Sequence, residues 1–98
     1  MLKRDNILLA LEKNKDTIKG FGARRLGLFG STVRDEAGPD SDLDFIVEFE
    51  NVSFDAYMDL KFYLEDLFKK KVDLAISDSI KPRLRPIIMK EVVYVPGL

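Results

Sequence analysis

Hydrophobic positions along the chain follow two different spacings. Apolar residues three and four positions apart, with charged residues between them, predict helices, whereas short alternating or continuous apolar runs predict strands. The expected helices cover residues 4–19, 32–37, 53–68 and 82–91, and the expected strands cover residues 24–29, 43–50, 71–76 and 92–95. Helices that alternate with strands in this way indicate an α/β (α+β) fold, with helices flanking a small mixed β-sheet of three to four strands.

Glycine, serine and proline mark the expected ends of these elements. Gly20 and Gly22 are expected to end the first helix. Ser31 and Ser53 are expected N-caps, because a serine hydroxyl can accept a hydrogen bond from a free N–H of the first turn. Pro86 falls inside the last expected helix, which is tolerable only if that helix starts late or bends.

Length and composition predict one domain in the cytoplasm. With 98 residues, of which 46% are apolar, residues 1–98 are expected to form a single domain around one modest core. No apolar run approaches the roughly 20 residues of a membrane span, and the charged start of the chain does not resemble a secretion signal. The absence of cysteine suits a reducing cytosol.

Histidine is absent as well, which narrows the possible chemistry. Ser-His-Asp and Cys-His catalysis are excluded, and a zinc site would have only carboxylate ligands, which is rare. The net charge is −1, so direct nucleic-acid binding and attraction to anionic lipid are not expected. An enzyme of this composition has to use carboxylates, lysine, arginine, tyrosine or serine, and a hard metal ion is the expected cofactor.

Three aspartates on expected strands form a candidate metal site. Asp42 and Asp44 are two positions apart, so both side chains leave the same face of one strand. Asp73 lies in a later strand and can join them if the two strands are neighbours. Carboxylates at this spacing suit magnesium, which prefers oxygen ligands and takes others from water and substrate phosphates. Any one of these aspartates, taken alone, is more often a solvated residue of a strand edge, and it is the set of three that favours a metal site.

A Gly-Ser pair after the first expected strand is a candidate phosphate site. Gly30 lets the backbone approach a ligand, and Ser31 offers a hydroxyl and an N–H. Arg34, three residues later, can reach a phosphate oxygen. A plain capped turn and a solvated arginine explain the same residues, and the segment is not a Walker motif, because no Gly-Lys-Ser/Thr follows.

The combination of these features resembles a known family. The chain is similar to the nucleotidyltransferase superfamily that includes DNA polymerase beta. The similarity rests on Leu-Phe-Gly-Ser at residues 28–31, then ten further residues, then Asp42 and Asp44, with Ser41 before them and Asp73 downstream. The short chain resembles the minimal nucleotidyltransferase (MNT) branch. The resemblance covers about residues 7–95 and implies the small mixed sheet expected above.

The resemblance also implies roles for these residues. Asp42 and Asp44 would ligate two magnesium ions, and Asp73 would ligate one of them and help to deprotonate the attacking hydroxyl. Gly30 and Ser31 would hold the triphosphate of ATP. Arg34 matches the family pattern and, with Ser41, would belong to the nucleotide site. The reaction would transfer AMP to a hydroxyl and release pyrophosphate.

Three functions remain open on this basis. Minimal members are commonly antitoxins that adenylylate a tyrosine of a HEPN-type ribonuclease toxin, so the chain is expected to be such an enzyme, with the acceptor supplied by the partner protein. The first alternative is a non-catalytic antitoxin that acts by binding and occlusion. It is favoured by Thr32, where the family often has arginine, and by Asp35, where it often has glycine. The second is one half of a two-chain nucleotidyltransferase that modifies a small molecule, such as an antibiotic.

Overall fold

A mixed four-stranded sheet organises the molecule. The computed structural model describes residues 3–36, 38 and 40–98. Its sheet has the order β3-β2-β1-β4. β2 and β3 are parallel, whereas β1 runs antiparallel to both β2 and β4. The strands are β1 (Ala23–Leu28), β2 (Leu43–Phe49), β3 (Val72–Ile76) and β4 (Val93–Tyr94), which confirms the predicted mixed sheet.

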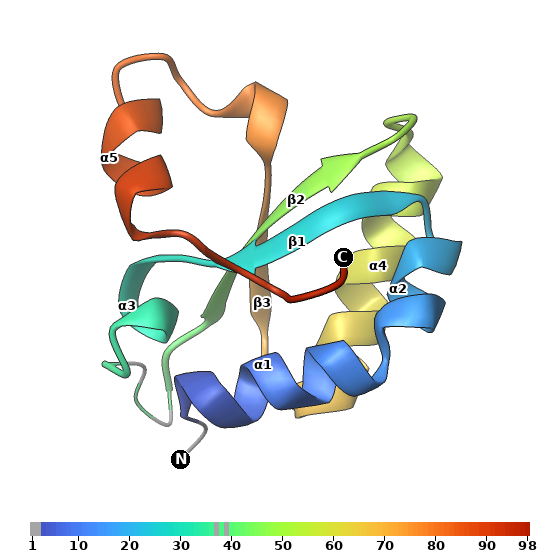
Figure 1. Ribbon diagram of the computed structural model, residues 1–98, viewed down its shortest axis with the longest axis horizontal. Helices are drawn as coiled ribbons and strands as arrows, with labels where there is room; N and C mark the ends of the chain where they lie inside the picture. Colours follow the sequence, from blue (N-terminus) through green and yellow to red (C-terminus); the bar gives the residue numbers. More distant parts are fainter. Residues whose placement is uncertain (1–2, 37, 39) are drawn as a thin grey trace.

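Helices pack mainly on one side of this sheet. In Figure 1, α1, α2 and α4 gather on that side, and α5 stands apart from them, close to α3. Within the described residues, no helix has the length and apolarity that a bilayer crossing requires. The helices are α1 (Arg4–Lys13), α2 (Lys15–Gly20), α3 (Gly30–Val33), α4 (Phe54–Phe68) and α5 (Arg85–Glu91), with a short 3₁₀ helix, η1 (Ser77–Ser79), after β3.

Alternation along β2 builds the core, as the sequence predicts. Every second residue from Leu43 to Phe49 is buried against the helices. The ring of Phe45 stacks on that of Phe68 from α4, with 5.9 Å between ring centroids. Other buried residues come from both layers: Ile7, Leu11, Ile18, Leu26, Leu28, Leu60, Leu64, Val72 and Leu74. Each fully buried side chain of this size contributes about 1.5–3 kcal/mol through removal of apolar surface from water.

The opposite face of β2 is only partly polar. Ile46 shares it with Asp44 and Glu48, yet Ile46 is completely buried. Ile46 pairs in register with Gly27 of β1. The side chain of Val92 lies so close to Gly27 that a Cβ added there would be 2.9 Å from it. The C-terminal segment therefore covers this part of the face and leaves the two acids half-buried beside it.

The first predicted helix is interrupted in the structure. Asn14 separates α1 from α2, and its side-chain amide donates to the carbonyl of Ala10 at 2.8 Å. Asparagine competes for backbone groups in this way and so disfavours helix continuation. The predicted end is confirmed: α2 ends at Gly20, and Gly22 has a φ of +92°.

The prediction of a helix at residues 32–37 with Ser31 as its N-cap is wrong. α3 begins earlier, at Gly30, and Phe29 occupies the N-cap position without a side-chain cap. The Ser31 hydroxyl donates to Oδ2 of Asp44 at 3.4 Å instead of accepting from the helix. Ala37, the expected end, lies outside the described residues.

The other two helix predictions differ in accuracy. Ser53 caps α4 as expected, because its hydroxyl accepts from the N–H of Ala56 at 3.1 Å. The last helix was expected from Pro82 but begins at Arg85, which places Pro86 in its first turn. A proline there removes no helical hydrogen bond, so the late start resolves the conflict.

Two side chains of α4 secure the outer edge of β3. The Tyr57 hydroxyl donates to the carbonyl of Leu74 at 2.6 Å, and the Glu65 carboxylate accepts from the N–H of Val72 at 3.0 Å. An edge strand with free backbone groups is prone to pairing with other chains. These bonds satisfy part of that edge and fix the strand that carries Asp73.

Candidate active site

The candidate metal-binding acids come from two neighbouring strands. Asp44 of β2 lies in register with Asp73 of β3, and parallel strands lie about 4.8 Å apart. Asp42 lies two residues before Asp44, at the entrance to β2, and is exposed. The expectation that the strand of Asp73 borders that of Asp44 is therefore confirmed.

Asp44 is the most constrained of these acids. Its N–H donates to the hydroxyl of Thr32 at 2.7 Å, and its Oδ2 accepts from the Ser31 hydroxyl. Burial raises the pKa of Asp44, and the charges of Asp73 and Asp42 raise it further, while the bond from Ser31 lowers it. Thr32, itself buried, thus anchors the backbone of Asp44, a role that its sequence position did not reveal.

The chemistry of this set suits a hard cation. All its donors are oxygens, which magnesium prefers. Burial is the main cause of the raised pKa of Asp44, and the charges of Asp73 and Asp42 add to it, so a bound cation would favour the ionised carboxylate. Across residues 3–36, 38 and 40–98, however, no three acidic side chains are already arranged as a metal site. The acids therefore fit magnesium by type and by strand placement, and substrate phosphates would have to complete the site.

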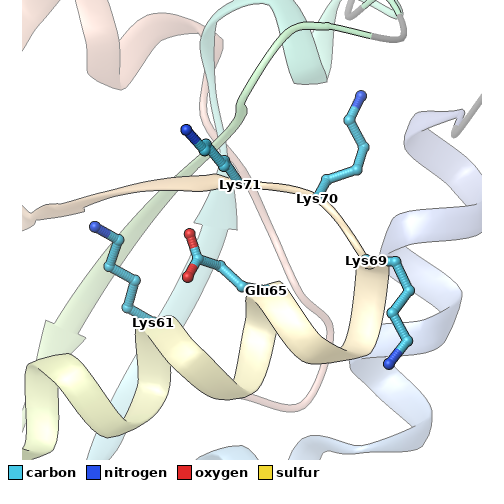
Figure 2. Close-up of a pocket in the computed structure, with 5 residues that line it drawn as sticks. All are labelled: Lys61, Glu65, Lys69, Lys70 and Lys71. Carbon is cyan, nitrogen blue, oxygen red and sulfur yellow. The ribbon is translucent and has the colours of Figure 1, made fainter.

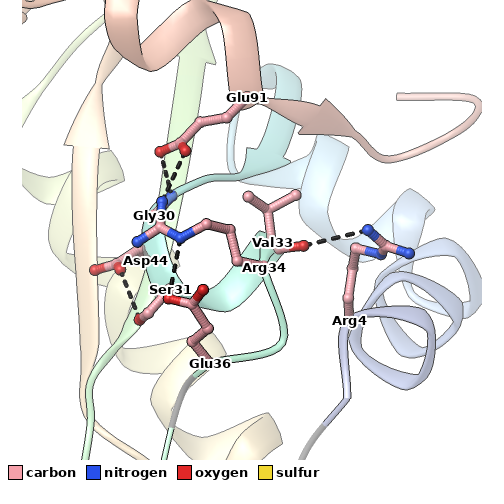
Figure 3. Close-up of polar contacts among 8 residues, drawn as sticks. All are labelled: Arg4, Gly30, Ser31, Val33, Arg34, Glu36, Asp44 and Glu91. Carbon is pink, nitrogen blue, oxygen red and sulfur yellow. Dashed lines mark hydrogen bonds and ion pairs between the residues drawn. The ribbon is translucent and has the colours of Figure 1, made fainter.

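Gly30 lies directly against Asp44. Its φ of +62° belongs to the left-handed region, and a Cβ added there would lie 2.6 Å from Oδ2 of Asp44. Only glycine lets the backbone come this close. The Gly30 N–H donates to Oε1 of Glu91 at 2.8 Å, as Figure 3 shows.

Arg34 binds two acids in the structure. Its Nη1 lies 2.8 Å from Oε2 of Glu91, and its Nε lies 3.1 Å from Glu36. The hydrogen bond that Arg34 donates to Glu36 raises the pKa of Arg34, and so do the charge of Glu36 and the contacts with Glu91, although desolvation opposes this. Sequence reasoning missed Glu91, which lies 61 positions after Gly30 and carries no local motif.

Ser41, expected in the nucleotide site, closes a local turn. Its hydroxyl accepts from the N–H of Gly38 at 3.2 Å, and its own N–H donates to the Gly38 carbonyl. That carbonyl also accepts from Nζ of Lys70 at 2.8 Å. The structure therefore uses Ser41 to shape the loop before Asp42.

Asp35 makes contacts with the N-terminal helix. Its φ is +58°, a conformation that glycine or an Asp/Asn side chain tolerates best. Its carboxylate accepts from the N–H of Arg4 at 2.6 Å. Figure 3 shows the second contact of Arg4, in which Nη1 donates to the carbonyl of Val33. Asp35 thus joins α1 to the end of α3.

Replacing Asp35 with alanine should lower the free energy of unfolding by about 1–2 kcal/mol, because alanine loses the bond to Arg4 and is strained at positive φ. Asp35→Gly removes the same bond without that strain, so it should cost less. Urea denaturation of the three proteins measures both values. Equal stability of the alanine and glycine variants would show that backbone strain is not important here.

A separate hollow of about 540 Å³ lies where α4 meets β3. Figure 2 shows that lysines dominate its lining. Lys69 pairs with Asp66, and Glu65 is engaged by the backbone of Val72. With four lysines and one glutamate, this lining is mainly basic, and it includes none of the three candidate aspartates. The lining residues are Lys61, Glu65, Lys69, Lys70 and Lys71.

Comparisons with known proteins identify the family of this chain. Residues 8–95 match the family model described as nucleotidyltransferase domain. The chain is 40% identical over 97 residues to the protein adenylyltransferase MntA of Thermococcus cleftensis, which covers 97% of this chain and 98% of that relative.

Solved structures give the same picture. A provisionally assigned minimal nucleotidyltransferase superposes with a TM-score of 0.82 at 32% identity and covers 94% of this chain and 95% of its own. A chain in the complex of a tri-AMPylated Shewanella oneidensis HEPN toxin with an MNT antitoxin shares the fold, with a TM-score of 0.65 at 18% identity over 93% of this chain and 73% of that one. The chain therefore belongs to the nucleotidyltransferase domain family, in its minimal nucleotidyltransferase branch.

Proposed function

We propose that this chain transfers AMP from ATP to a tyrosine hydroxyl of a HEPN-type toxin and so acts as its antitoxin, in the cytoplasm and as a single domain. The name of the Thermococcus relative supports protein adenylylation. The solved complexes support the partner and the nucleotide, since one contains a tri-AMPylated HEPN toxin and another is a toxin–antitoxin with AMP-PNP.

One observation carries the proposal: Gly30 is pressed against Asp44, which faces Asp73 on the adjacent parallel strand. A nucleotidyltransferase has to hold phosphates and metal ligands this close together. Asp42, Asp44 and Asp73 would hold magnesium, which supplies neutralisation of the phosphate charge.

The chain's own residues would then act as follows. The N–H of Gly30 and the hydroxyl of Ser31 bind the triphosphate, and Arg34 supplies a positive charge to it. The carboxylate of Asp73 accepts the proton of the attacking hydroxyl. A bond forms between that oxygen and the α-phosphorus. The bond between the α-phosphorus and the oxygen that bridges it to the β-phosphorus breaks, and pyrophosphate leaves with that oxygen. The protein's main contribution is to position these groups.

The second candidate function is occlusion of the toxin without catalysis. One observation favours it: in the described parts of the chain, no three acidic side chains are already arranged to hold a metal ion. Thr32 and Asp35 no longer support it, because each has a structural role.

Co-expression of the toxin with the double variant Asp42→Asn and Asp44→Asn separates the two functions. We expect this variant to fail to protect cells, although it accumulates and binds the toxin. Glu48→Gln, on the same face of β2, should protect like the wild type. Full protection by the double variant would establish occlusion instead.

A further inference from the structure

α5 is held in place by polar contacts at its two ends. None of its seven residues is buried. At its start, the Arg85 guanidinium donates to the carbonyl of Ser77 and, at 3.2 Å, to its hydroxyl. At its end, Glu91 binds Gly30 and Arg34. Because little apolar burial fixes this helix, the contacts of Glu91 contribute strongly to its position.

Glu91 uses both carboxylate oxygens on these partners. Oε1 accepts from the N–H of Gly30 and Oε2 from Nη1 of Arg34, each at 2.8 Å (Figure 3). A backbone N–H beside a guanidinium is an arrangement that binds carboxylate and phosphate oxygens alike. These are the same two groups assigned above to the triphosphate, and they cannot satisfy two anions at once.

We propose that Glu91 is an internal latch: its carboxylate occupies the phosphate-binding groups of Gly30 and Arg34 when no nucleotide is present, and the triphosphate displaces it and frees the end of α5. This inference rests on the proposed function, because it takes the triphosphate to bind at Gly30. By linkage, ATP loosens α5, and any contact that holds α5 in the latched position weakens ATP binding to the same degree.

The latch makes a prediction with a definite sign. The apparent affinity for a ligand equals the intrinsic affinity multiplied by the fraction of molecules that are competent to bind it. A latched molecule is not competent, so the latch lowers the apparent affinity for the nucleotide. Weakening the latch should therefore tighten nucleotide binding. If Glu91 instead stayed in place to orient Arg34 toward the phosphates, weakening its contacts would loosen nucleotide binding.

The test compares two charge-neutralising variants by calorimetric titration with magnesium and α,β-methylene ATP, which cannot be cleaved. Glu91→Gln keeps the length of the side chain and an oxygen for Gly30 but loses the charge. We expect its dissociation constant to be about tenfold lower than that of the wild type, within the usual range of coupling between sites. Glu36→Gln is the matched control: it removes the other carboxylate on Arg34 without touching Gly30, and should change affinity by less than about threefold.

Hydrogen exchange provides a second readout, and its first part uses the unmodified protein. The analogue should speed exchange of the amides at residues 87–91, and in Glu91→Gln these amides should exchange fast even without it. Equal affinity of wild type and Glu91→Gln, or weaker binding by the variant, would overturn the latch and leave the proposed function standing. If neither protein binds the analogue, both the latch and the proposed function fail.

Discussion

Asp44→Asn should reduce AMP transfer about 1,000-fold and at the same time stabilise the metal-free protein. Charge stabilisation by a metal is worth several kcal/mol in the transition state, and each 1.36 kcal/mol is a factor of ten in rate. Asparagine keeps the size of the side chain and the backbone bond to Thr32, but it is a poor magnesium ligand. Transfer rates at saturating ATP and magnesium measure the loss.

The gain in stability follows from the raised pKa of Asp44. The folded protein holds this proton more tightly than the unfolded chain, so ionisation costs folding free energy as the pH rises above about 4, the ordinary value for aspartate. Asparagine removes that cost at neutral pH. The stability difference between Asp44→Asn and the wild type should shrink near pH 3, because aspartate is then largely protonated in both the folded and the unfolded state.

Thermal melts with and without magnesium test this pair of effects. Magnesium should raise the melting temperature of the wild type, because it binds the folded state alone, and should leave Asp44→Asn almost unchanged. Glu48→Gln, a neutralisation four positions along the same strand, should keep both activity and the magnesium response. A wild-type melting temperature that ignores magnesium, even with ATP present, would contradict a metal site at Asp44.

Gly30→Ala is expected to have the second largest effect, a loss of about 100-fold in transfer. The new methyl group would lie 2.6 Å from Oδ2 of Asp44, and alanine is strained at a φ of +62°. Either the aspartate or the backbone has to move, and a displacement of about 1 Å in a positioning group costs roughly this factor.

Gly20→Ala provides the matched control, since a Cβ there meets nothing within 4 Å. It should keep full activity, so a loss shared by both variants would point to general destabilisation. A Gly30→Ala protein with normal transfer would show that the close approach to Asp44 is not needed.

The sequence predicts the parts of this molecule that depend on local pattern. Alternation along β2 identifies the buried face and places Asp44 on the opposite side, whereas Asp42, expected on the same strand, lies just before it. Asn14 breaks the first helix through a single side-chain bond that hydrophobic spacing does not register. Prediction is weaker where a short polar residue can bond either to its own helix or across the fold, as Ser31 does with Asp44.

Long-range contacts account for what sequence reasoning missed. Glu91 reaches Gly30 only because β4 returns the chain to the edge of β1. The left-handed backbone of Asp35 is a conformation that glycine also adopts, and the bond of Asp35 to Arg4 depends on where α1 packs. The predicted roles of Arg34 and Ser41 in nucleotide binding remain predictions, since the structure shows both engaged with other residues.

The most direct test of the central claim follows the phosphates of ATP. The protein is incubated with magnesium, its partner toxin and ATP labelled at either the α- or the γ-phosphate. The account predicts that the α-label appears on the toxin, that the γ-label leaves as pyrophosphate, and that Asp44→Asn transfers almost none. A γ-label on the toxin, or an α-label that Asp44→Asn transfers as well as the wild type, would contradict it.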